Sequence, residues 1–145
     1  MTESQQLDAG LTAEKIGELI TNDDKGARHM GIILLEISPG VAIVRLRLEE
    51  HHMNHHNTCH GGVTFMLADT AFAYACNSHD QKTVGLSCSI NYMKPAFLGD
   101  ILIAEAREES KTGRTGVYNV TVTNQDKELI SVFRGQAYSL KETVL

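Results

Sequence analysis

A pair of glycines, Gly61 and Gly62, stands at the start of an almost wholly apolar stretch that ends near Asn77. Asp69 is the only carboxylate in this stretch, and an ionised carboxylate among apolar side chains is costly unless it is paired or used. Glycines at a helix start leave backbone N–H groups open to an anion, such as the negative charge that develops on a reacting carbonyl oxygen. A carboxylate together with such amides indicates acyl-transfer chemistry.

Asp69 also has two simpler explanations, which are that it faces solvent or that it meets a structural partner across an interface. Aspartate is usually exposed, so the residue alone favours these explanations. The glycine pair, together with Asn54 upstream, shifts the balance toward a catalytic role.

The spacing between Gly62 and Asp69 predicts how such a site is assembled. On one helix they lie about two turns apart, roughly 10 Å along the axis. An oxyanion donor must sit about 3 Å from the carbonyl oxygen, while the base must reach a water beside the carbonyl carbon. One helix fits both tasks poorly, whereas two antiparallel helices across a dimer axis bring the glycines of one chain opposite the carboxylate of the other. We therefore expect a site made by two chains.

Five histidines crowd the segment before the glycines and raise the question of a metal site: His51, His52, His55, His56 and His60. Some of these histidines are four residues apart, but they lie in an expected loop. The sequence has neither a helical His-x-x-x-His with its glutamate nor a cysteine pair with zinc spacing. We therefore expect no metal and interpret them as solvated loop residues, with His60 fixing the loop through hydrogen bonds.

Other nucleophiles fit the sequence less well. Cys59 precedes His60 directly, but sequence neighbours seldom point at each other, so a buried thiol is the better interpretation. Ser87 and Ser89 lack the Gly-x-Ser-x-Gly elbow of serine hydrolases.

Length and charge exclude several classes of protein. The 145 residues fit one domain, 1–145, and the net charge of −5 argues against nucleic-acid binding. No apolar run approaches the roughly 20 residues of a membrane span, and the polar residues 1–8 lack a signal-peptide pattern. The three cysteines, Cys59, Cys76 and Cys88, suit reduced thiols, which predicts a cytoplasmic protein without membrane contact.

Hydrophobic periodicity predicts two helices. Residues 1–10 look frayed, and a short helix is expected over residues 11–22 with Thr12 as its N-cap. The central helix is expected from Gly62 to about Asn77, and because it is apolar nearly all round, it should be buried.

The rest of the chain is expected to be strands. Residues 32–37 and 41–48 flank Ser38-Pro39-Gly40 and predict a hairpin. Further strands are expected over residues 83–92, which alternate cleanly, and over 101–109, 115–123 and 129–140. One buried helix followed by antiparallel strands is an α+β arrangement, and the alanine-rich helix predicts a sheet wrapped round it.

Three motifs carry a resemblance to a known family: Asn54-x-x-Asn57-x-x-His60-Gly61-Gly62, Leu67-Ala68-Asp69-Thr70-Ala71-Phe72-Ala73-Tyr74-Ala75-Cys76-Asn77 and Leu86-Ser87-Cys88-Ser89-Ile90-Asn91-Tyr92-Met93-Lys94-Pro95. Over roughly residues 31–140 the chain resembles the hotdog-fold acyl-CoA thioesterases, and most closely their phenylacetic-acid-degradation group. Asn57 stands where many relatives carry glycine, and asparagine tolerates the left-handed backbone that such a glycine supplies.

The resemblance implies a hotdog fold, and dimers in which two sheets join edge to edge, often paired into a homotetramer. It implies hydrolysis of acyl-CoA thioesters, with small aryl-acetyl groups such as phenylacetyl or hydroxyphenylacetyl, in phenylacetate catabolism. No cofactor is expected, since coenzyme A is part of the substrate. The family's catalytic carboxylate corresponds to Asp69, its carbonyl-polarising amide to Gly61 or Gly62, and its supporting polar residues to Asn54 and His60.

In the mechanism this implies, the glycine amide and the helix dipole stabilise the tetrahedral oxyanion. Asp69 then deprotonates a water or attacks the carbonyl directly to form an anhydride, and the sequence leaves both routes open. Thr70 is a candidate for holding the water, and Asn54 for positioning the thioester or the loop. A partly buried setting would raise the pKa of Asp69 and make it a better base.

Residues that contact the substrate are harder to assign. Lys94, Lys111 and Arg114 are candidates for the phosphates of coenzyme A, and ordinary solvated charge is an equally good explanation. Pocket walls are expected from apolar and aromatic residues that also suit a plain core, namely Phe65, Met66, Phe72, Tyr74 and Met93. The alternative function is a non-catalytic acyl-CoA-binding or ligand-sensing protein.

Overall fold

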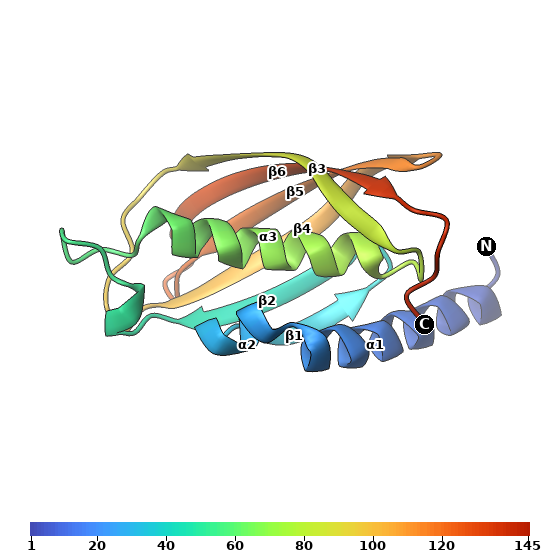
Figure 1. Ribbon diagram of the computed structural model, residues 1–145, viewed down its shortest axis with the longest axis horizontal. Helices are drawn as coiled ribbons and strands as arrows, with labels where there is room; N and C mark the ends of the chain where they lie inside the picture. Colours follow the sequence, from blue (N-terminus) through green and yellow to red (C-terminus); the bar gives the residue numbers. More distant parts are fainter.

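A single antiparallel sheet curls round one long helix in the computed structural model, which describes residues 1–145 (Figure 1). The elements in chain order are α1 (Glu3–Asp23), α2 (Lys25–Met30), β1 (Ile33–Ser38), β2 (Val41–Arg47), a short 3₁₀ turn η1 (Glu50–His52), α3 (Gly61–Asn77), β3 (Thr83–Tyr92), β4 (Ile101–Thr112), β5 (Thr115–Thr123) and β6 (Leu129–Ser139). The strand order is β1-β2-β4-β5-β6-β3, so β1 and β3 are the edges. The expected α+β arrangement is confirmed.

The helix α3 is buried because it has no continuous polar face. Phe72 at its centre packs against Tyr118 of β5 and Phe133 of β6, with ring centroids 5.6 and 5.9 Å away. Gly135 on β6 permits this close approach, since a Cβ there would lie 2.7 Å from the Phe72 ring. The contact fixes how far α3 stands from the sheet.

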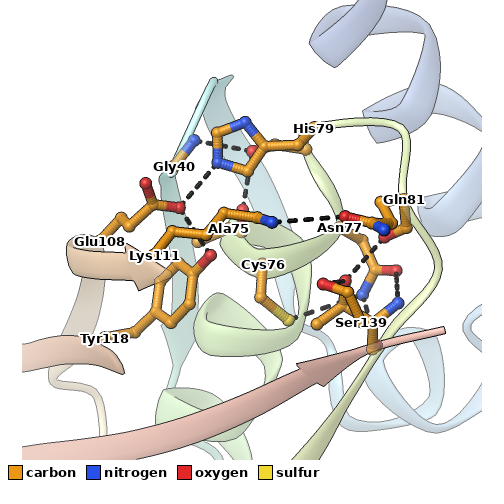
Figure 2. A network of polar contacts seen from close by, with 12 residues as sticks. Gly40, Ala75, Cys76, Asn77, His79, Gln81, Glu108, Lys111, Tyr118 and Ser139 are labelled. Carbon is orange, nitrogen blue, oxygen red and sulfur yellow. Dashed lines mark hydrogen bonds and ion pairs between the residues drawn. The ribbon is translucent and has the colours of Figure 1, made fainter. Parts of the chain in front are cut away.

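A polar network holds the C-terminal end of α3 (Figure 2). Glu108 of β4 accepts hydrogen bonds from His79 and from Tyr118, each at 2.7 Å. The Asn77 amide donates to the carbonyl of Thr83 at 3.0 Å and accepts from its N–H at 2.9 Å. The helix is therefore anchored to β3 and β4, which fixes the direction of the side chains along it.

The N-terminal segment is helical from its beginning, so the expectation that residues 1–10 are frayed and that Thr12 caps the helix is wrong. Thr2 is the N-cap, its hydroxyl accepting the Gln5 N–H at 3.2 Å, while the Gln5 side chain accepts the Thr2 N–H at 2.8 Å. This reciprocal capping box starts the helix ten residues earlier than Thr12 suggests, because it satisfies two otherwise unpaired amides.

The helix α2 was not expected from the sequence. Asp24 starts it by accepting the Ala27 N–H at 2.9 Å, and Gly31 ends it with a φ of 86°. Because Asp24 separates two helices, the chain turns there and carries a carboxylate to the side of α3.

The edge strand β3 exposes apolar side chains. Its bounds match the expected strand, but a bulge between Gly85 and Ser87 breaks the clean alternation. Val84, Leu86 and Tyr92 are exposed, and only Cys88 and Ile90 of the expected buried face are partly covered. A long apolar edge strand with unpaired backbone groups is a ready site for another strand.

Candidate active site

The two glycine amides at the start of α3 have different environments. The Gly62 N–H donates to Nδ1 of His60 at 3.0 Å, so the side chain of the N-cap residue already satisfies it. The Gly61 N–H has no hydrogen-bond partner, whereas its carbonyl accepts the Tyr92 hydroxyl at 2.9 Å. Of the two candidates, Gly61 therefore has the amide that is free to bind an oxyanion.

A cleft of about 320 Å³ opens beside Gly61. Its walls come from the segment before α3 and from the end of β3, and they include Tyr92, Met93 and Lys94. Two of the residues expected to bind substrate, Met93 and Lys94, thus lie beside the free amide. The Lys94 ammonium pairs with Glu128 at 2.7 Å on the exposed rim.

Asn54 holds the loop that leads to the glycines. Its side-chain oxygen accepts the N–H groups of His56 at 2.8 Å and Thr58 at 3.2 Å, and its amide donates to the Thr58 hydroxyl at 3.0 Å. Asn57 within this loop has a φ of 60°, the left-handed conformation expected for it. Of the two roles considered for Asn54, these contacts match positioning of the loop.

His52 corrects the interpretation of the histidine cluster as solvated. The other four histidines are exposed, but His52 is buried. Its Nδ1 accepts the Glu49 N–H and its Nε2 donates to the Met30 carbonyl, each at 2.9 Å. The neutral ring therefore ties η1 to the end of α2. Burial lowers the pKa of His52, with the Met30 carbonyl acting in the opposite direction.

The contribution of His52 to stability should depend on pH. A pKa lowered in the folded state means that the stabilisation is present above the unfolded value near 6.5 and is lost as the pH falls through the lower folded value. We expect the free energy of unfolding, measured by urea titration between pH 8 and pH 5, to fall more steeply for the parent than for His52→Gln. The exposed neighbour provides the matched control, His51→Gln, which should follow the parent. Equal slopes for parent and His52→Gln would contradict this role.

Asp69 has no hydrogen-bond or ion-pair partner within the chain, and its side chain is exposed on one side of α3. Protein atoms still crowd it: partial burial, and next the Asp24 carboxylate, raise the pKa of Asp69. Its charge in turn contributes to the raised pKa of the Cys88 thiol on β3. Asp69 therefore lies between the edge strand β3 and the junction of α1 and α2, with no partner for its carboxylate within the chain.

Three other expected site residues are placed differently. The Thr70 hydroxyl is buried and donates to the Met66 carbonyl at 2.7 Å, and Phe65 packs on Phe133 with ring centroids 5.4 Å apart. Arg114 lies in the β4–β5 turn, and its backbone carbonyl accepts the N–H of Ser139. The β4–β5 turn is at the same end of the molecule as the C-terminal end of α3 (Figure 1). Phe65 follows Gly61 by four residues on the same face of α3, whereas nothing in the structure brings Thr70 or Arg114 to Gly61.

The Cys59 thiol is a poor nucleophile in this setting. Burial raises the pKa of Cys59, and its sulfur lies 3.4 Å from the Thr64 hydroxyl. All three cysteines are free, and no group of three or more His, Cys, Asp or Glu side chains converges as metal ligands would.

Among the helices, none combines the length and the apolarity that a bilayer crossing requires.

Similarity to known proteins identifies the family. Residues 56–131 match the Thioesterase superfamily. The acyl-coenzyme A thioesterase PaaI of Escherichia coli is 38% identical over 84% of this chain and 87% of its own. The chain belongs to the thioesterase superfamily. This thioesterase has the hotdog fold, and the family and fold expected from the sequence are confirmed.

Solved structures support the same assignment for the thioesterase. The structure of the E. coli PaaI protein from the phenylacetic acid degradation operon superposes with a TM-score of 0.91 at 35% identity, over 92% of this chain and 97% of its own. A Streptococcus mutans protein bound to acetyl CoA superposes with a TM-score of 0.75 at 28% identity, over 77% of this chain and 90% of its own.

Two residues of this thioesterase's site region were missed from the sequence. Tyr92 was interpreted as one member of an alternating strand and of the third motif, without a role in the site, although its hydroxyl binds the Gly61 carbonyl. Asp24 was passed over because α2 was not expected, and its signal was its position as a helix N-cap. Both depend on contacts between segments far apart in the sequence, which periodicity does not reveal.

Proposed function

We propose that this acyl-CoA thioesterase hydrolyses small aryl-acetyl thioesters, such as phenylacetyl-CoA or hydroxyphenylacetyl-CoA, to the free acid and coenzyme A in phenylacetate breakdown. The observation that carries the chemistry is the unpartnered Gly61 N–H at a cleft, together with an unpaired Asp69 of raised pKa. The similarity to PaaI of E. coli supports the aryl-acetyl group, and the S. mutans protein with acetyl CoA supports coenzyme A as the carrier.

In the proposed mechanism the thioester carbonyl oxygen accepts a hydrogen bond from the Gly61 N–H, and the helix dipole of α3 adds positive potential there. Asp69 removes a proton from the attacking water, or it attacks the carbonyl itself to form an anhydride that water then hydrolyses to the free acid. In both routes the thiolate of coenzyme A leaves. Met93 and Lys94 border the path of the substrate at the Gly61 cleft. Water and thioester suffice, so no cofactor takes part.

The two reacting parts come from different chains in this proposal. Gly61 begins α3, and Asp69 lies about 12 Å further along the same axis, too far for one carbonyl group to meet both. The apolar edge β3 is open to a second copy of the chain, and Asp69 lies beside that edge. Antiparallel pairing at β3 would bring the Gly61 of one chain to the Asp69 of its partner. Further pairing into a tetramer, and the cytoplasmic location, remain predictions.

Mixed dimers test the shared site. Dimers made of one Asp69→Asn chain and one Gly61→Pro chain should regain one intact site of two, because one site receives both undamaged parts. We expect about half the parental activity per mixed dimer, measured on dimers purified through two different affinity tags.

The controls are dimers of each damaged chain alone, which should stay near background. Background activity in verified mixed dimers, or full activity in a monomer, would show that one chain supplies both parts.

The proposed function itself is tested by release of free coenzyme A from phenylacetyl-CoA, compared with acetyl-CoA and a straight-chain acyl-CoA of similar size. We expect the highest kcat/KM for the aryl-acetyl thioester. Tight binding without turnover of any thioester would instead indicate the non-catalytic acyl-CoA-binding protein.

A further inference from the structure

The peptide that joins Gly61 to Gly62 is held by side chains at both of its polar ends. Its carbonyl, that of Gly61, accepts the Tyr92 hydroxyl at 2.9 Å, and its N–H, that of Gly62, donates to Nδ1 of His60 at 3.0 Å. The preceding peptide is held as well, since the His60 carbonyl accepts the Val63 N–H at 2.9 Å. Among the carbonyl and N–H groups of the two peptides that flank Gly61, only its own N–H has no partner in the chain.

A glycine does not fix the direction of its own N–H. Without a Cβ, Gly61 has more backbone freedom than other residues, so the planes of its two flanking peptides determine where the N–H points. The contacts made by His60 are local, whereas Tyr92 comes from the end of β3, 31 residues away in the sequence. The Tyr92 contact therefore ties the start of α3 to the sheet and limits how the Gly61 backbone can rotate.

The Tyr92 hydroxyl acts on the backbone and not on the substrate oxygen. Its ring forms part of the wall of the Gly61 cleft, and a Cβ on Gly61 would lie 3.1 Å from the hydroxyl oxygen, so the phenol lies against the glycine backbone. A tyrosine hydroxyl has one proton to donate, and Tyr92 donates it to the Gly61 carbonyl. Any contribution of this hydroxyl to oxyanion binding therefore passes through the peptide that it holds.

We propose that Tyr92 is a positioning residue of the oxyanion site: its hydroxyl fixes the Gly61–Gly62 peptide and so aims the free Gly61 N–H at the thioester carbonyl oxygen. An oxyanion donor contributes most when its direction is set before the reaction, because nothing then has to reorient as the charge develops. The inference rests on the proposed function, in which the Gly61 N–H binds that oxygen.

The first test is Tyr92→Phe, which removes only the hydroxyl. Tyr92 is 54% exposed, so the variant should fold, as circular dichroism can check. The single-turnover rate with phenylacetyl-CoA should fall by about threefold to tenfold, the scale of one neutral hydrogen bond, while KM stays near the parental value. The matched control is Tyr138→Phe on β6, which removes a hydroxyl without a hydrogen-bond partner and should leave the rate as in the parent.

Two further readouts show whether the hydroxyl acts through the Gly61 N–H. In a Gly61→Pro chain, which lacks that N–H, adding Tyr92→Phe should cost no further rate, whereas two independent roles would multiply the two losses. The second readout is the infrared carbonyl stretch of a bound ketone analogue of phenylacetyl-CoA, in which a methylene group replaces the thioester sulfur. The parent should shift this stretch to lower frequency, and Tyr92→Phe should lose part of the shift.

A parental rate or an unchanged carbonyl stretch in folded Tyr92→Phe would overturn this inference and leave the proposed function intact. A further loss of the same size in the Gly61→Pro chain would also overturn it, because the hydroxyl would then act without the amide. A parent that released coenzyme A from no thioester would overturn the proposed function and this inference with it.

Discussion

Replacing Asp69 by asparagine should lower kcat for thioester hydrolysis by about a hundredfold or more, which is the scale of a lost general base. The amide has nearly the same shape, and Asp69 forms no hydrogen bond or ion pair within the chain, so Asp69→Asn should keep the fold and the assembly. The measurement is steady-state release of coenzyme A, with circular dichroism and light scattering on the same samples.

The pH profile adds a second readout for Asp69. Only the ionised carboxylate acts as base or nucleophile, so parental kcat/KM should fall as the pH drops through the pKa of Asp69, which partial burial and Asp24 raise above 3.8. The residual activity of Asp69→Asn should lack this acid limb. Asp126→Asn, in the exposed β5–β6 turn, is the control and should behave as the parent. Near-parental hydrolysis by folded Asp69→Asn would remove Asp69 from the mechanism.

Replacing Gly61 by proline should lower the single-turnover rate by roughly a hundred- to a thousandfold, the usual cost of one lost oxyanion donor. Proline suits the first position of a helix, and His60 before it has φ −59° and ψ 131°, a conformation that a following proline accepts. The substitution therefore deletes the free N–H while the backbone keeps its path.

The matched control for this variant is Gly61→Ala, which adds a Cβ but keeps the N–H. A Cβ at this position would lie 3.1 Å from the Tyr92 hydroxyl, so the tyrosine must shift slightly in both variants. We expect Gly61→Ala to retain far more activity than Gly61→Pro, whereas Gly62→Pro deletes an N–H that the His60 side chain already binds. Parental single-turnover rates in both proline variants would exclude either amide as the oxyanion donor.

Periodicity predicted most of this fold because the signals are local. The strands β3 and β5 have the expected bounds, and the turn residues Gly113 and Asn124 frame β5. Side-chain caps explain the misses. Thr2 and Gln5 lengthen α1 through a reciprocal pair of hydrogen bonds, and Asp24 starts α2 through one bond to Ala27. Neither cap leaves a trace in the hydrophobic periodicity.

The candidate site was predictable in its residue types but not in its division of tasks. The sequence could not separate Gly61 from Gly62, because the difference is whether the His60 ring bends back onto one amide. Similarly, the buried ring of His52 is bound by the carbonyl of Met30, 22 residues earlier in the chain, which the local pattern does not reveal. The distant placement of Arg114 depends on sheet register, which a single strand pattern does not fix.

The separation of Gly61 and Asp69 along one helix has a genetic consequence. In a dimer with shared sites, a chain damaged at only one of these residues spoils a single site of the pair when it joins an intact chain. A chain damaged at both residues spoils both sites, because it withholds the amide from one and the carboxylate from the other. The double lesion in one chain should therefore be dominant over a co-expressed intact copy, whereas the same two lesions on separate chains should partly complement each other.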